Sequence, residues 1–237
     1  MKLLVDPHSH TIASGHAYST ISENAAAAAK AGITLLGITE HAPAMPDSTS
    51  LSYFFNLNAV PRELYGVELL LGAELNITDY EGSVDLPENF LEYLDIGIAS
   101  LHPPCLPFGT LEQNTGALLR VMELPRVNII GHPGDPRYPL DIPEVVAQAI
   151  KTKTLLEINN VSLMPEGFRK GSREGIIEIL RLCEKLSYPV VLGSDAHFFT
   201  HIGEFGNCVR LLEELSFPEE LVINRSPAEF KAFIAQK

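Results

Sequence analysis

The chain has 237 residues, of which 46% are hydrophobic, so it can bury a sizeable core as one large domain or two small ones. Its formal net charge of −13 argues against a broad basic surface for nucleic acid. Three cysteines without CxxC spacing (Cys105, Cys183 and Cys208) argue against a disulfide framework and fit a reducing compartment.

The N-terminus lacks the apolar stretch of a signal peptide, and no apolar run approaches the ~18 residues of a membrane span. We therefore expect a cytoplasmic protein without a membrane partner. The acidic charge also means that an anionic substrate would need a local source of positive charge.

Short apolar runs alternate with amphipathic stretches along the whole chain. Strands are expected at residues 3–5, 35–38, 67–72, 96–99, 127–130, 155–158 and 190–192, with a further short strand at 221–224. Helices are expected at residues 23–31, 57–65, 87–94, 110–123, 142–151, 172–186 and 204–215, and after Pro227. Ser22, Thr110 and Ser226 are the expected N-caps, and residues 76–85 fit an irregular excursion or small hairpin.

Seven or eight strand–helix units without a break in composition predict one α/β domain over residues 1–237, with a parallel sheet. Periodicity cannot distinguish an open sheet from a closed one. The number of units favours a barrel over an open sheet of five or six strands.

Histidines follow the predicted strands with unusual regularity. Side chains alternate along an extended chain, so His8 and His10 point the same way. Parallel strands end at one face, where their terminal side chains can converge. The candidates for such a cluster are His8, His10, His16, His41, His102, His132 and His197, with Glu74 and Asp195 at equivalent strand ends.

A single strand-end histidine is more often a hydrogen-bonded structural residue than a ligand. Seven uncoordinated imidazoles together are harder to explain, because neutral rings need donors and charged rings repel one another. Histidine with carboxylate, and no cysteine, suits Zn²⁺, Mn²⁺ or Fe rather than Mg²⁺ or a structural zinc cage. Nine candidate ligands leave room for two or three ions. His201 lies outside the pattern and is expected at the surface.

These residues resemble the PHP (polymerase and histidinol phosphatase) superfamily, and within it the YcdX-like bacterial phosphatases. The likeness rests on His8-x-His10, His16, Thr39-Glu40-His41, Glu74, His102, His132-Pro133-Gly134 and Ser194-Asp195-Ala196-His197, and extends to Glu157-Ile158-Asn159-Asn160 and Arg169-Lys170-Gly171-Ser172. The resemblance implies a distorted (β/α)7 barrel with a trinuclear metal site and phosphoesterase activity. It allots one ion to His8, His10, Glu74 and Asp195, a second to Glu74, His102 and His132, and a third to His16, His41 and His197.

Two positions depart from the family pattern. Glu40 stands where the family usually has Asp, and we expect it to orient an imidazole rather than bind metal. Pro103 stands where a polar residue is common, which bears on substrate preference.

The expected function is a metal-dependent phosphatase that hydrolyses small anionic phosphate monoesters with metal-activated hydroxide. Three Zn²⁺ ions, or Mn²⁺ or Fe in their place, would supply the positive charge that the composition lacks. Glu74 and Asp195 are the candidate catalytic carboxylates. Arg169, Lys170 and Arg137 are candidates for binding the phosphate, because they lie in loops after predicted strands.

Three alternatives remain open at this stage. A nuclease or phosphodiesterase is disfavoured by the acidic charge, and no nucleic acid partner is expected. An amidohydrolase-type metal hydrolase commonly bridges two ions with a modified lysine, and no lysine ends a predicted strand here. A non-catalytic metal-binding module would use the same ligands. The sequence leaves the oligomeric state open, a homo-oligomer included.

Overall fold

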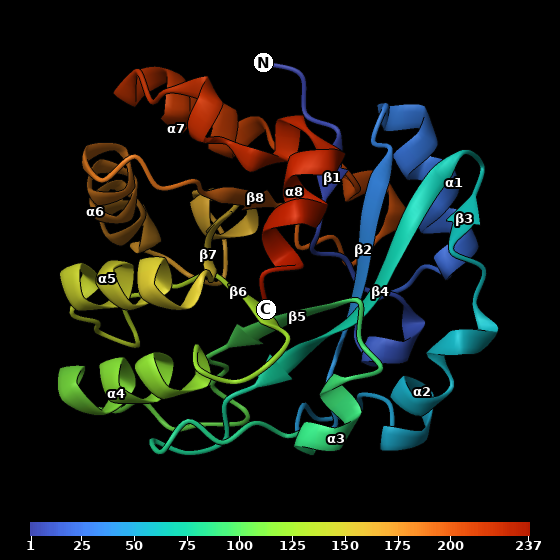
Figure 1. Ribbon diagram of the computed structural model, residues 1–237, viewed down its shortest axis with the longest axis horizontal. Helices are drawn as coiled ribbons and strands as arrows, with labels where there is room; N and C mark the ends of the chain where they lie inside the picture. The colour runs from blue at the N-terminus through green and yellow to red at the C-terminus, as the bar shows by residue number, and fades with distance from the viewer.

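Seven parallel strands form one sheet in the computed structural model, which describes residues 1–237. Their order in space follows the chain: β1 (Val5–Asp6), β2 (Leu35–His41), β4 (Val67–Asn76), β5 (Ile96–Ser100), β6 (Val127–Ile130), β7 (Leu155–Asn159) and β8 (Val191–Gly193). A short strand, β3 (Glu63–Leu64), pairs with β4 in the antiparallel direction. The predicted distorted (β/α)7 barrel is confirmed, because this sheet curls until its first and last strands nearly meet (Figure 1).

Helices surround the sheet (Figure 1). They are α1 (Ile21–Ala31), α2 (Leu51–Phe55), α3 (Glu88–Leu91), α4 (Leu111–Val121), α5 (Ile142–Thr152), α6 (Ser172–Lys185), α7 (Gly206–Leu215) and α8 (Pro227–Ile234). Six 3-10 turns connect them: Ile12–Ser14, Leu57–Ala59, Val161–Leu163, Phe199–His201, Glu219–Leu221 and Ile223–Arg225. No helix combines the length and the apolar character needed to cross a membrane.

The hydrophobic core has two parts. A large layer packs the helices against the outer face of the sheet. A smaller cluster fills the barrel interior with residues from the early parts of the strands, such as Val5, Leu35 and Ile96, and Phe230 and Ile234 of α8 join it. Helix α8 therefore closes one end of the barrel and leaves the carboxyl ends of the strands at the other.

Asn224 closes the gap between β8 and β1. Its amide donates to the carbonyls of Leu192 (2.8 Å) and Val5 (2.9 Å), and its Oδ1 accepts from the Leu192 N–H (2.8 Å). Its own carbonyl accepts from the Leu4 N–H (2.8 Å). One fully buried side chain thus replaces the missing ladder between two strands that are too short to pair along their whole length.

Several predicted boundaries are wrong. The helix expected at 57–65 is a 3-10 turn followed by β3, because Pro61 lacks the N–H that a helix interior needs. The strand expected at 221–224 is reduced to a single parallel bridge between Val222 and Val190, with a 3-10 turn on either side of Val222. The N-cap of α1 is Thr20 rather than Ser22, in a reciprocal capping box with Glu23.

Two predicted N-caps are confirmed, and two other segments are close to their predicted form. Thr110 caps α4, and Ser226 caps α8, which has Pro227 in its first turn. The seventh predicted helix begins at Gly206 rather than at residue 204. The excursion at 76–85 contains a small antiparallel bridge between Ile77 and Val84, as expected for a hairpin-like turn.

Substituting Asn224 with alanine should lower the free energy of unfolding by about 3 kcal/mol, because buried backbone groups of Val5 and Leu192 lose their partners. Urea denaturation measures this change. Asn58→Ala, at an exposed position of a 3-10 turn, is the matched control and should change stability by less than about 0.5 kcal/mol. Equal stability of the two variants would show that Asn224 does not close the barrel.

Candidate metal centre

All nine predicted ligands lie at the carboxyl ends of the strands. His41 and Glu74 belong to β2 and β4, whose pairing sets them side by side. His16 lies ten residues after β1, the other six follow strands within four residues, and all but His16 and His197 are buried. The direction shared by parallel strands therefore gathers these side chains in one place.

The first group of donor atoms gathers around His8 and His10. His8 Nε2 and His10 Nε2 lie 3.1 Å apart. Each lies 3.5 Å from Glu74 Oε2, and they lie 3.6 and 3.4 Å from Asp195 Oδ1. Four donors at about 2.0–2.1 Å from a tetrahedral zinc ion are separated by about 3.3 Å. The observed separations match that spacing.

The other oxygen of Glu74 serves a second group. His132 Nε2 lies 3.1 Å and His102 Nε2 3.3 Å from Glu74 Oε1, which also accepts a hydrogen bond from the Ser100 hydroxyl (2.6 Å). His41 Nδ1 lies 2.8 Å from Glu74 Oε2. The Glu74 carboxylate thus stands between two sets of imidazoles.

The rings of the remaining three histidines lie together, with centroids 4.8 Å apart for His16 and His41, 4.9 Å for His16 and His197, and 5.8 Å for His41 and His197. His10, His41 and His197 bring ligand atoms within 4.8 Å of one another, and so do His41, Glu74 and His102. His16 joins neither group, but its Nε2 lies 3.1 Å from His197 Nε2. His41 therefore faces Glu74 as well as the third predicted site.

The hydrogen bonds of His8 and His102 fix which ring nitrogen carries the proton. His8 Nδ1 lies 2.6 Å from Glu157 Oε1, which can only accept. His102 Nδ1 lies 2.7 Å from Asn76 Oδ1, and the nitrogen of that amide donates elsewhere. Both rings must therefore donate from Nδ1, which turns an Nε2 lone pair toward the cluster.

His10 and His197 follow the same rule through different partners. The Ser14 hydroxyl donates to Glu40 Oε2 (2.6 Å), so it accepts from His10 Nδ1 at 3.0 Å. His197 Nδ1 donates to the Asp195 backbone carbonyl (2.9 Å). The Glu40 departure from the family pattern thus orients an imidazole through Ser14, as expected.

Converging lone pairs are repulsive unless a cation lies between them. His41 Nδ1, Glu74 Oε2 and His102 Nε2 are buried and make no hydrogen bond of acceptable geometry, although the first two atoms lie 2.8 Å apart. Such orphaned groups are costly in a protein interior. Neutral imidazole nitrogens and carboxylate oxygens are the donors that zinc-type ions prefer, so the residues present fit divalent metal ions.

Protonation of His8 would compete with a metal ion, because a second proton on the ring would occupy the Nε2 lone pair. Burial disfavours the charged form of His8, but Glu157, Glu74 and Asp195 outweigh it and hold the pKa of His8 well above its usual value. Burial and the neighbouring His41 hold the pKa of His10 well below its usual value. The surroundings of His8 thus favour a positive charge, whereas those of His10 favour a neutral ring.

The backbone at the cluster adopts strained conformations. His132 (φ +34°) and Asp195 (φ +51°) occupy positive φ, which L-residues seldom adopt and which concentrates at functional sites. Gly193 has no room for a side chain, because a Cβ there would lie 1.8 Å from Glu157 Oε1. The strained and crowded positions thus coincide with the residues that form the cluster or adjoin it.

Glu157 is the functional residue that sequence reasoning missed. In the sequence it stands only within a family-like segment. In the structure its Oε1 accepts from His8 Nδ1 and its Oε2 accepts from the His132 backbone N–H (2.7 Å). Its signal was available, because it stands near the carboxyl end of a predicted apolar strand, as Glu74 does.

The predicted phosphate-binding residues lie in different settings. Arg169 is 12% exposed and donates from Nη1 to Asp195 Oδ2 (3.1 Å), so the structure brings it to the cluster. Lys170 is 70% exposed and pairs with Glu166 at 3.5 Å, away from the ligands.

Arg137 is held by Asp135, three residues beyond His132. Its Nε donates to Asp135 Oδ1 (2.9 Å) and its Nη2 to Oδ2 (2.6 Å). The guanidinium also lies over the ring of Phe168, with Cζ 4.2 Å from the ring centroid. Arg137 is thus fixed beside the cluster rather than free in solvent.

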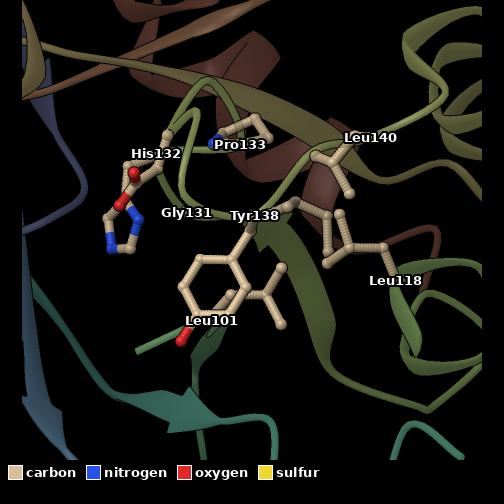
Figure 2. A pocket seen from close by; sticks show the side chains of 9 residues that line it. Leu101, Leu118, Gly131, His132, Pro133, Tyr138 and Leu140 are labelled. Atoms are coloured by element: carbon tan, nitrogen blue, oxygen red, sulfur yellow. The ribbon is translucent and has the colours of Figure 1, made fainter. Parts of the chain in front are cut away.

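The packing behind His132 is apolar and tight. Leu101, Tyr138 and Leu140 close around the backbone of this loop (Figure 2). The space left there is about 10 Å³, no more than a single water needs. These side chains support the ligand loop and do not form a substrate pocket.

Comparison with known proteins identifies relatives of the whole chain. The PHP domain family model matches residues 6–234. Proteins of Clostridium novyi and Caldicellulosiruptor saccharolyticus, both named probable phosphatases, are 46% and 47% identical to the chain. The alignments cover 100% and 99% of this chain and 96% and 97% of those proteins.

Among solved structures, the histidinol phosphate phosphatase of Lactococcus lactis, crystallised with zinc, L-histidinol and phosphate, shares the fold. Its TM-score is 0.63 at 16% identity, over 90% of this chain and 94% of that one. The family match and the relatives together show that the chain belongs to the PHP domain family.

Proposed function

We propose that this protein is a metal-dependent phosphatase that hydrolyses small phosphate monoesters at a centre of up to three zinc-type ions. The observation that carries the proposal is the set of histidine and carboxylate lone pairs turned inward around Glu74, three of them orphaned. The names of the 46% and 47% identical relatives support phosphatase chemistry. Zn²⁺ fits the donors best, and Mn²⁺ or Fe could replace it.

Each proposed ion has its own set of ligands. His8, His10, Glu74 and Asp195 would hold one ion. Glu74 with His102 and His132 would hold a second, and His16, His41 and His197 are the ligands proposed for a third. When bound, such ions lower the pKa of water and neutralise phosphate charge.

Glu74 and Asp195 are the catalytic carboxylates in this proposal. Burial raises their pKa values, but the adjoining histidines outweigh burial and hold both well below their usual range. Both side chains therefore remain anionic at neutral pH and keep the ligand set in position while phosphate charge changes.

Arg169 is the residue best placed to contact a phosphate oxygen. Nη1 is committed to Asp195, and the rest of the guanidinium retains donors for an anion. In the same proposal, Lys170 and Arg137 contact the substrate from outside the ligand set.

A small ester is the proposed substrate class. The L. lactis neighbour was solved with L-histidinol and phosphate, which are small molecules, and its fold is shared. The net charge of −13 disfavours polyanionic substrates such as nucleic acid.

Chelation should abolish hydrolysis of p-nitrophenyl phosphate, and added Zn²⁺ or Mn²⁺ should restore it.

His132→Ala should lower kcat/KM at least ~100-fold with unchanged circular dichroism, because it removes a donor beside Glu74. His201→Ala, at an exposed position outside the cluster, is the control and should retain activity. Turnover that survives both chelation and His132→Ala would refute the proposal, and faster cleavage of bis-p-nitrophenyl phosphate would indicate a phosphodiesterase instead.

Glu157→Ala should weaken zinc binding about 10–100-fold, because His8 loses the acceptor that fixes its tautomer. Competition with a chromogenic chelator measures the affinity without any need for turnover. The matched control is Glu178→Ala, an exposed glutamate on α6. Equal affinity in the two variants would mean that Glu157 has only a structural role.

A further inference from the structure

Two arginines flank Phe168, one in sequence and one in space. Arg169 follows it and donates to Asp195, a proposed ligand. Arg137 lies over its ring and is held by Asp135, whose backbone N–H donates to the His132 carbonyl (3.4 Å). The Phe168 ring is therefore held on one face by Arg137, and its backbone adjoins Arg169, which contacts a proposed ligand.

The ring remains largely open to solvent despite this anchoring. Phe168 is 71% exposed, although Arg137 stacks on it. Phe108, from the loop after β5, is 56% exposed and lies 5.8 Å from the same guanidinium. Two exposed aromatic rings held by one fixed guanidinium indicate a binding site rather than a solvated loop.

Exposed aromatic rings also adjoin the opposite part of the ligand set. The Tyr18 N–H donates to the His197 carbonyl (3.0 Å), and the side chain of Tyr18 is 73% exposed. Phe198 follows His197 directly and is 39% exposed. We call Tyr18, Phe108, Phe168 and Phe198 the aromatic border. Its members come from the loops after β1, β5, β7 and β8.

We propose that the aromatic border binds the organic part of the substrate, so that the preferred substrates are phosphate monoesters of aromatic or heteroaromatic alcohols. The inference rests on the proposed phosphatase function, because the phosphate must face the metal centre. A planar ring gains both burial and offset or edge-to-face contact with Phe168, whereas an alkyl group gains burial alone. Arg137 fixes the Phe168 ring in advance, which reduces the entropy lost on binding.

Non-hydrolysable phosphonates test the inference by calorimetry on the zinc-loaded full chain. Benzylphosphonate should bind about tenfold more tightly than methylphosphonate. Phe168→Ala should weaken benzylphosphonate binding about fivefold to tenfold and methylphosphonate binding less than about twofold. Phe168→Tyr should restore the preference, since it keeps the ring. Tyr93→Ala, an exposed aromatic that precedes β5 at the other end of the barrel, should leave both affinities unchanged.

The outcomes separate this inference from the proposed function. Equal binding of the two phosphonates, or an equal loss of both in Phe168→Ala, would overturn the aromatic border while p-nitrophenyl phosphate turnover stands. Selective binding of benzylphosphonate without turnover of any ester would support the border and overturn the phosphatase proposal. No binding of either phosphonate would overturn the inference directly.

Discussion

The Glu74 carboxylate is the constraint on which the rest of the centre depends. It is buried in the longest strand, and its two oxygens face five imidazoles, those of His8, His10, His41, His102 and His132. The parallel register pairs Glu74 with His41 on one side and Ile98 on the other. A slip of one residue would turn Glu74 to the helix-covered face and dismantle both donor sets at once.

Holding so many donors together works against stability until a cation arrives. Orphaned lone pairs, positive φ at two ligands and a crowded Gly193 all oppose folding. Hydrogen bonds that the rings donate to Glu157, Asn76 and Ser14 fix the rings in place and prevent relaxation. Metal binding to such a prepared site contributes to folding free energy, so loading and stability should be coupled.

Much of this centre could be predicted because one geometric rule governs it: parallel strands end on the same face. That rule found His8 through His197 from local sequence alone. It could mark Glu157 as a carboxylate near a strand end but not its contact with the His8 ring 149 residues away, since no local pattern encodes that contact. The same limit explains the missed role of Asn224, whose side chain substitutes for a strand. Other errors have a local cause. The apolar spacing predicts a helix at 57–65, but Pro61 and the short hairpin of β3 and β4 prevent one.

The distribution of charge links the fold to the chemistry. The arginines nearest the centre are already paired, Arg169 with Asp195 and Arg137 with Asp135, so each adds little net positive charge to its surroundings. The chain as a whole carries −13. An anionic ester would therefore meet a repulsive field in the absence of metal and an attractive one only after the donors around Glu74 are filled. Under the proposed function, the protein would fix the geometry and the ions would supply the charge, so substrate affinity should depend on metal loading as strongly as turnover does.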